Sequence, residues 1–164
     1  ELTINSSKEI YDNQSILKNN GMIAINSVKT SGTVIGGNLC PLKLLQGTEY
    51  MPNLNDSILF IEDDADDFKN DVFLLEFDRN LESLLQSKNS NIKGIVFGRF
   101  ELCSNMTIEK LKTLIKQKEK LKNIPIVFGA DFGHTNPMFT IPIGGTCTLD
   151  IKPNNIKIEF KKSR

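Results

Sequence analysis

The sequence lacks an excess of charge of one sign and lacks any long apolar run. Its 164 residues carry 20 lysines and arginines against 20 aspartates and glutamates, so the formal net charge is zero. Because it has no basic excess and no basic stripe with interleaved aromatic residues, we expect no nucleic-acid partner. The apolar runs are a handful of residues long and no signal-peptide pattern opens the chain, so we expect no membrane partner. The length suits one domain with its own core.

Cysteine is also scarce. The three cysteines, Cys40, Cys103 and Cys147, are odd in number and are never spaced as C-x-x-C. This pattern argues against a disulfide framework and against a zinc site. We therefore predict no metal and no cofactor, and a reducing, cytoplasmic location.

The first twenty residues differ from the rest of the chain. Residue 1 is Glu rather than Met, and the segment 1–20 is polar, rich in Asn and Ser, and without a sustained period. We interpret 1–20 as a linker from a missing N-terminal domain and 21–164 as a C-terminal domain.

From residue 21 onward, strand patterns alternate with helix patterns. Short apolar runs bounded by turn residues predict strands over 21–28, 32–37, 57–62, 92–100 and 124–129, followed by a hairpin over 146–160. Apolar residues at helical spacing predict helices over 40–48 and 68–88, and a third that begins at a Thr107 cap and includes Leu121. This order predicts an α/β fold, a mixed β-sheet or small barrel with parallel central strands and flanking helices.

His134 is the only histidine in the chain. It lies in "IVFGADFGHTNPMFTIPIGG", residues 126–145, where a short loop with a glycine follows a predicted strand. A strand end fixes the backbone and a loop exposes the side chain, so this is a common place for a functional residue. On this pattern alone, a structural histidine is the commoner case, and both interpretations stay open.

The acidic segment "EDDADD", residues 62–67, follows another predicted strand. Asp64 and Asp66 have the spacing of calcium ligands, but the glycine and the later glutamate of an EF-hand loop are missing. We interpret most of the segment as a solvated loop before a helix, where the helix dipole favours acids. Glu62 ends the apolar strand directly, so we expect it to be the least solvated of the six residues.

Glu62 and His134 together form two thirds of a nucleophile, base and orienter system. A base needs a pKa near the working pH, and a carboxylate on its far nitrogen fixes the tautomer and stabilises the imidazolium. The nucleophile is missing, because no G-x-S-x-G elbow occurs and the three cysteines lie in contexts that do not predict a reactive thiolate.

Four blocks of the sequence resemble a known family. They are "GTVIGGNLCPLKLLQGTEYMPNLNDSILFIEDDADD", "IKGIVFGRF", "IPIVFGADFGHTNPMFTIPIGG" and "TCTLD". Their order and spacing resemble the C-terminal half of the LD-carboxypeptidase and microcin C immunity serine peptidases, over about residues 21–150. "HTNPMFTIPIG" and "GTEYMP" are more similar to the microcin immunity branch than to the murein branch.

The resemblance implies a two-domain serine peptidase. A flavodoxin-like N-terminal domain would carry the nucleophilic serine, and a C-terminal barrel of the swivelling β/β/α type would supply Glu62 and His134 as the rest of the triad. It further implies that Asn38, Gly37 and Asp63 bind substrate. Gly36 and Gly37 would allow close approach to the backbone, with a tight turn as the alternative.

The implied reaction is hydrolysis of an amide bond in a microcin C-like aminoacyl or peptidyl nucleotide, which would give self-immunity. The alternatives are an LD-carboxypeptidase acting on a murein tetrapeptide, a non-catalytic ligand-binding module, and a purely structural domain. The acidic segment 62–67 would repel a phosphate, which counts against a nucleotide lying directly on it. The implied partners are the missing N-terminal domain, the peptide or aminoacyl-nucleotide substrate and, since such proteins commonly pair, a second copy in a homodimer.

Overall fold

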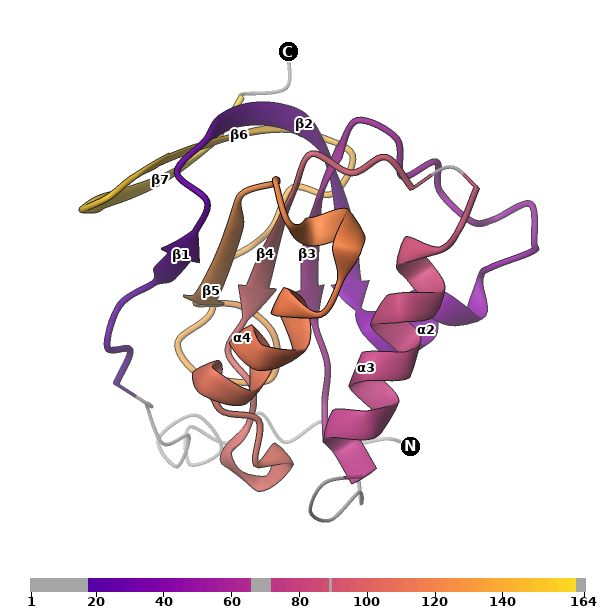
Figure 1. The fold of residues 1–164 in the computed structure, drawn as a ribbon, viewed down its shortest axis with the longest axis horizontal. Coiled ribbons are helices and arrows are strands. Elements are labelled where there is room, and N and C mark those ends of the chain that lie inside the picture. Colours follow the sequence, from indigo (N-terminus) through magenta and orange to yellow (C-terminus); the bar gives the residue numbers. More distant parts are fainter. Residues whose placement is uncertain (1–17, 66–71, 89, 162–164) are drawn as a thin grey trace, which may run out of the picture.

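The computed structural model describes residues 18–65, 72–88 and 90–161. Seven strands form one mixed sheet in the order β1-β5-β4-β3-β2-β6-β7 (Figure 1). The strands are β1 (Ile23–Ile25), β2 (Lys29–Asn38), β3 (Ser57–Glu62), β4 (Gly94–Gly98), β5 (Ile126–Ala130), β6 (Thr146–Lys152) and β7 (Asn155–Phe160). The mixed α/β sheet predicted from the sequence is confirmed.

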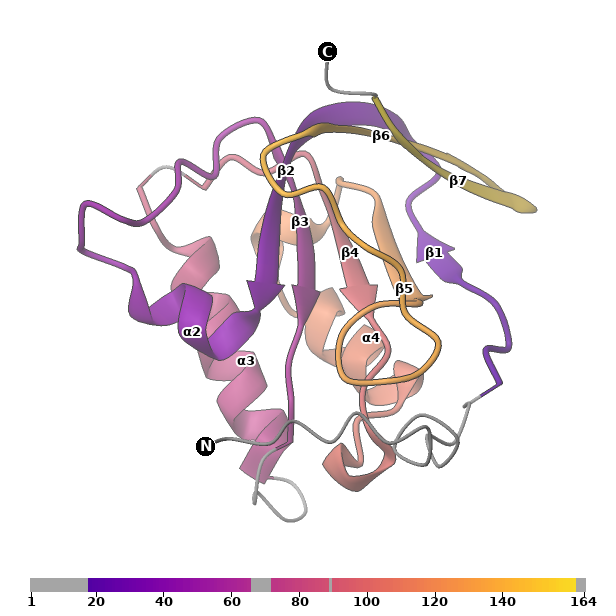
Figure 2. The same cartoon turned by 180° about the vertical axis from the view of Figure 1, so that it is seen from behind.

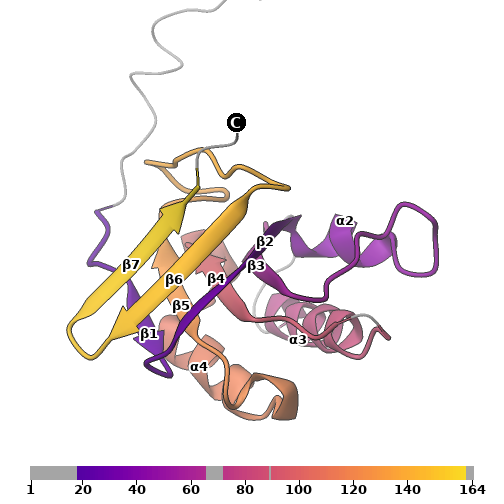
Figure 3. The same cartoon turned by 90° about the horizontal axis from the view of Figure 1, so that it is seen from above.

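The centre of the sheet is parallel. β2 pairs with β3, β3 with β4, and β4 with β5, all in parallel. Antiparallel strands extend both sides, because β1 pairs with β5 and the β6–β7 hairpin pairs with β2. β2 contacts β6 over 29–33 and β3 over 33–38, so one long strand joins the hairpin to the parallel centre. The sheet curls strongly along this strand, toward a nearly closed barrel (Figure 3).

Helices cover one face of the sheet (Figure 1). Within the described residues these are α2 (Leu39–Leu44), α3 (Val72–Leu85) and α4 (Ile108–Lys116), with the short 3₁₀ helices η1 (Leu102–Ser104) and η2 (Glu119–Leu121). The helices bury an apolar face against the sheet, which α3 does through Phe73, Phe77, Leu81, Leu84 and Leu85. None of these helices is long and apolar enough to cross a bilayer.

A second apolar cluster lies on the other face, inside the curl of the sheet. Val34, Phe60, Val96 and Val127 of the parallel strands pack there with Phe132, Cys147 and Leu149. Residues of β1 and β7 pack against the same cluster from the two edges. Both faces of the parallel strands are therefore buried, which explains why these strands read as continuous apolar runs rather than as alternating patterns.

Several predicted boundaries are wrong in detail. The strand predicted over 21–28 is confined to Ile23–Ile25, and the strand predicted over 92–100 is confined to Gly94–Gly98. Thr107 does cap α4, but α4 ends at Lys116 and Leu121 belongs to η2. Residues 1–17 of the predicted linker and 68–71 of the predicted helix lie outside the described residues.

The three cysteines are unpaired, as the sequence predicted. Cys40 and Cys103 are exposed, whereas Cys147 is buried and its burial raises the pKa of the thiol to about 12. Because the thiolate is the reactive form, Cys147 should be inert in the native chain. We expect an aromatic disulfide reagent to modify two thiols per native chain and all three after denaturation. Modification of all three thiols in the native chain would contradict the packing around β6.

Candidate active site

The carboxyl ends of β2, β3, β4 and β5 lie along one edge of the sheet, because these strands are parallel. Asn38 is the last residue of β2, and Glu62 is the last residue of β3. The loop 131–145, which carries His134, returns to this edge after β5 (Figure 2). Sites in parallel sheets gather at such an edge, since the strands fix the backbone and the loops expose the side chains.

Glu62 and His134 are in contact at this edge. Nδ1 of His134 lies 2.6 Å from Oε2 of Glu62. The Glu62 side chain is 10% exposed and the His134 side chain is 46% exposed, so the carboxylate is inside and the ring is accessible. When Nδ1 donates its proton to the carboxylate, the neutral ring keeps its basic lone pair on Nε2. The structure thus joins the two residues that the sequence indicated, while their catalytic role stays a prediction.

Two glycines make room for the Glu62 side chain. A β-carbon at Gly133 would lie 2.9 Å from Cβ and 3.1 Å from Oε2 of Glu62, and Gly133 has a φ of +100°. A β-carbon at Gly98 would lie 3.2 Å from Cβ of Glu62 and 2.6 Å from the carbonyl oxygen of Phe132. A larger residue at Gly133 would press directly on the Glu62 carboxylate, and one at Gly98 would press on the Phe132 backbone and on the Glu62 side chain. The sequence analysis missed both contacts.

Asn38 fixes the segment that follows Glu62. Its side-chain oxygen accepts a hydrogen bond from the Cys40 N–H at 3.0 Å, which caps α2. Its side-chain nitrogen donates to Oδ1 of Asp64. Both polar atoms of Asn38 therefore have partners within the protein, and binding of substrate by Asn38 stays a prediction.

Asp63 is buried, contrary to the solvated loop predicted for most of the acidic segment. It is 6% exposed and Glu62 is 8% exposed, so Glu62 is not the least solvated residue. The physical reason is a contact with a distant segment, because the Asp63 carboxylate turns inward and accepts a backbone hydrogen bond from Cys40. Burial, followed by the charges of Asp64 and Glu62, raises the pKa of Asp63 from 3.8 to about 7, against the backbone hydrogen bonds that lower it. Its predicted substrate contact is untested, and Asp66 and Asp67 lie outside the described residues.

The raised pKa of Asp63 predicts a dependence of stability on pH. A carboxyl group that holds its proton more tightly when folded stabilises the fold at low pH, and this stability is lost as the pH rises toward the folded pKa of about 7. We expect the free energy of unfolding to fall by about 3 kcal/mol between pH 5 and pH 7.5, and to fall much less in Asp63→Asn. Urea unfolding followed by circular dichroism measures both, and equal slopes in the two proteins would contradict the buried carboxyl.

The pKa of His134 is raised above 6.5. Desolvation of the ring lowers the pKa, but the hydrogen bond and charge of Glu62, with the charges of Asp64 and Glu101, outweigh it. Glu101 follows β4 by three residues, and its carboxylate lies 3.4 Å from the Ala65 N–H. The sequence analysis missed Glu101, although an acid just after the strand in "VFGRFE" was an available signal.

The single histidine allows the pKa of the site to be measured directly. We expect Glu62→Gln to lower the pKa of His134, because the substitution removes the charge that stabilises the imidazolium. The histidine ring signal in a proton NMR titration reports this value without interference from other histidines. Glu109→Gln, on the exposed side of α4, is the matched control and should leave the titration unchanged. The stability given by the pair should be present below pH 6.5 and lost as the pH rises through the raised pKa.

Gly36 and Gly37 lie within a strand and not in a tight turn, so that alternative is wrong. Gly36 pairs with Phe60 and Gly37 pairs with Ile61 of β3. Their φ angles are +153° and +136°. A β-carbon at Gly36 would overlap the backbone of Phe60, whereas one at Gly37 would meet no atom within 4 Å. Gly37 therefore leaves open space at the edge, consistent with the predicted approach of a ligand.

The site is thus a buried acid bonded to an accessible imidazole at the carboxyl edge of a parallel sheet, an arrangement suited to general base chemistry. Comparison with known proteins identifies the family of the chain. Residues 31–149 match the family model described as the LD-carboxypeptidase C-terminal domain, and the chain belongs to this family.

Two named relatives match nearly the whole chain. The chain is 44% identical over 152 residues to YocD of Bacillus subtilis (strain 168), which carries a provisional carboxypeptidase name, with 92% of this chain and 45% of YocD covered. It is 33% identical to the microcin C7 self-immunity protein MccF of Escherichia coli, with 92% of this chain and 41% of MccF covered. The chain therefore spans less than half the length of these relatives.

Solved structures agree with the fold. An MccF-like protein from Bacillus anthracis str. Ames is 44% identical, with a TM-score of 0.81 over 87% of this chain and 43% of that chain. A muramoyltetrapeptide carboxypeptidase from Oxalobacter formigenes is 28% identical, with a TM-score of 0.66 over 86% of this chain and 50% of that chain. MccF itself has been solved in complex with aspartyl sulfamoyl adenosine, at 32% identity and a TM-score of 0.67 over 89% of this chain and 42% of that chain.

Proposed function

We propose that this chain is the half of a serine peptidase that supplies the general base and its orienting acid. The observation that carries the proposal is the 2.6 Å contact between Nδ1 of the accessible His134 and Oε2 of the buried Glu62. This contact leaves Nε2 to take a proton from a hydroxyl nucleophile. No serine or cysteine in the described part of this chain is hydrogen-bonded to His134. The nucleophile itself would therefore be a serine on the N-terminal domain of a longer protein that contains this chain, called the parent below.

The proposed reaction proceeds through an acyl-enzyme. Nε2 of His134 removes the serine proton while the serine oxygen attacks the amide carbonyl, and Glu62 stabilises the imidazolium that forms. The imidazolium then gives its proton to the leaving nitrogen as the carbon–nitrogen bond breaks. Nε2 of His134 then removes a proton from a water molecule that attacks the acyl ester. The imidazolium returns this proton to the serine oxygen as the ester bond breaks, which releases the acid and restores the serine. The charges of Asp64 and Glu101 further stabilise the cationic ring in both halves of the reaction.

The proposed substrate is a microcin C-like aminoacyl or peptidyl nucleotide, whose cleavage would give self-immunity. This is supported by 33% identity to MccF and 44% identity to the MccF-like protein of known structure. A murein tetrapeptide is the second candidate, supported by the match to a muramoyltetrapeptide carboxypeptidase. The acidic surroundings of His134, with Asp64 and Glu101 beside Glu62, count against a phosphate lying directly on them.

Hydrolysis by the full-length parent tests the proposal. The parent is offered a murein tetrapeptide and an aminoacyl sulfamoyl adenosine in parallel, and product is measured for the native protein, His134→Ala and the surface control Glu109→Gln. We expect cleavage of one substrate by the native protein and the control, and none by His134→Ala. Cleavage that survives His134→Ala would overturn the assignment. If the native parent cleaves neither substrate, the result would favour a non-catalytic binding module or a structural domain.

The isolated chain should be inactive under this proposal. Without the serine, triad-dependent acceleration should fall on the order of a million-fold, because the members of a triad act as a unit. The two exposed free thiols, Cys40 and Cys103, fit the reducing, cytoplasmic location proposed for the parent.

A further inference from the structure

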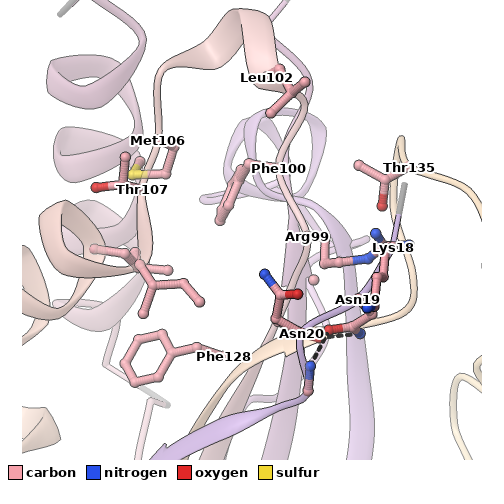
Figure 4. Close-up of a pocket in the computed structure, with 15 residues that line it drawn as sticks. Lys18, Asn19, Asn20, Arg99, Phe100, Leu102, Met106, Thr107, Phe128 and Thr135 are labelled. Atoms are coloured by element: carbon pink, nitrogen blue, oxygen red, sulfur yellow. Dashed lines mark hydrogen bonds between the residues drawn. The ribbon is translucent and has the colours of Figure 1, made fainter. Parts of the chain in front are cut away.

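A cavity of about 250 Å³ lies over the carboxyl ends of β4 and β5 (Figure 4). The start of α4 and the segment that precedes β1 close its sides. Its walls are mainly apolar, formed by Phe100, Leu102, Met106, Ile108, Leu111 and Phe128. The surface of this cavity is therefore suited to an apolar group.

The cavity shares two walls with the catalytic pair. Gly98 lines the cavity, and its α-carbon also faces Glu62, since a β-carbon there would lie 3.2 Å from Cβ of Glu62. Thr135 lines the cavity as well and directly follows His134 in the chain. A molecule that reaches His134 along the sheet edge therefore has this cavity beside it.

Thr135 is the polar group that the fold leaves unused. It is 4% exposed, and its Oγ1 has no hydrogen-bond partner among the described residues. Two other polar side chains that line the cavity already have partners: Asn19 donates to the Gly129 carbonyl at 3.0 Å and to Asp131 at 2.8 Å, and Arg99 pairs with Asp131 at 2.8 Å. A buried hydroxyl without a partner is costly, so its presence needs an explanation.

We propose that this cavity is a subsite for an aliphatic side chain of the substrate, and that the adjoining substrate amide hydrogen-bonds to the Thr135 hydroxyl. The hydroxyl can either donate or accept, so it can pair with the N–H or the carbonyl of that amide. The volume is below the 300 to 1,000 Å³ of typical small-molecule pockets, so the cavity suits one side chain and not a nucleoside. This inference rests on the proposed function, since it makes the cavity part of the same substrate site.

Binding to the chain tests the subsite without catalysis. N-acetyl-L-leucine amide and N-acetylglycine amide are titrated into the labelled chain, and backbone NMR shifts at Thr135 and Leu111 are followed. We expect the leucine probe to bind at least tenfold more tightly than the glycine probe. Equal binding of the two probes, or shifts that spare both residues, would overturn the proposal.

Thr135→Val separates a ligand-binding hydroxyl from a structural one. We expect this variant to bind the leucine probe about tenfold more weakly with an unchanged or higher melting temperature, because it removes an unpaired buried hydroxyl. Thr135→Ser should restore binding. Thr113→Val is the matched control and should leave binding unchanged, because the Thr113 hydroxyl donates to the Glu109 carbonyl within the exposed α4. Unchanged binding in Thr135→Val would contradict the proposed hydrogen bond between the Thr135 hydroxyl and the substrate amide.

Kinetics of the full-length parent distinguish the two proposals. Met106→Trp should fill part of the cavity and lower kcat/KM at least tenfold for a substrate with leucine beside the scissile amide, with little change for one with glycine. Hydrolysis that depends on His134 but shows no such preference would overturn the subsite and leave the proposed function standing. Leucine-selective binding that Thr135→Val weakens, without any hydrolysis by the parent, would overturn the peptidase proposal and leave the cavity as a ligand site.

Discussion

Replacing Glu62 by glutamine in the full-length parent should lower kcat by about 10⁴-fold, the loss expected when a catalytic imidazole is held in the wrong tautomer. Glutamine carries no charge to stabilise the imidazolium, and with its side-chain nitrogen in the place of Oε2, 2.6 Å from Nδ1, it donates a hydrogen bond there and cannot accept the Nδ1 proton. The ring would place its proton on Nε2, and the nitrogen that should face the nucleophile would no longer be basic. The fold should survive, because glutamine has nearly the same shape.

The measurement is the steady-state rate on whichever substrate the parent cleaves, with circular dichroism to confirm folding. Glu101→Gln is the informative comparison. Glu101 acts on His134 through charge, and glutamine keeps the acceptor near the Ala65 N–H, so about a tenfold loss is expected. If Glu62→Gln retained activity within tenfold of the native protein, Glu62 would not be the orienting acid.

The second large effect concerns the backbone beneath the site. Gly36→Ala should reduce the free energy of unfolding by more than about 4 kcal/mol, or prevent folding altogether. The added β-carbon would overlap the carbonyl of Phe60 in the neighbouring parallel strand, and Gly36 has a φ of +153°. The two strands would have to separate at the point where β2 delivers Asn38 and β3 delivers Glu62 to the edge.

Gly37→Ala is the matched control for this prediction. Gly37 also has a positive φ, +136°, but a β-carbon there meets no atom within 4 Å. Only the backbone strain remains, so the expected loss is about 1 to 3 kcal/mol. Urea unfolding followed by circular dichroism compares the two variants. Similar losses in both would contradict the close packing of Gly36 against β3.

Much of the fold was predictable because its central strands are short, apolar and separated by helical segments. That alternation forces parallel pairing, and parallel pairing brings the ends of β3 and β5 to one edge. The sequence analysis related Glu62 to His134 by their positions after predicted strands and by the family resemblance, and parallel pairing is the physical reason that the two positions meet. The Thr107 cap was also visible, since a threonine before an amphipathic stretch is a local signal.

The rest depended on contacts between distant segments, which local patterns do not encode. Asp63 was expected in a solvated loop, but the Cys40 N–H at the start of α2 draws its carboxylate inward. Gly98 and Gly133 matter because they pack against Glu62 from two other segments. The helix predicted through Leu121 ended early, at Lys116, because periodicity specifies which face is apolar but not where the chain turns.

The central claim is that His134, oriented by Glu62, activates a serine of the parent. The most direct measurement is the rate at which a fluorophosphonate labels the full-length parent, since this reagent reports an activated serine without requiring the natural substrate. We predict stoichiometric labelling of one serine outside this chain, slowed at least a thousandfold in both His134→Ala and Glu62→Gln. Labelling at the native rate in either variant, with the fold intact, would contradict the account.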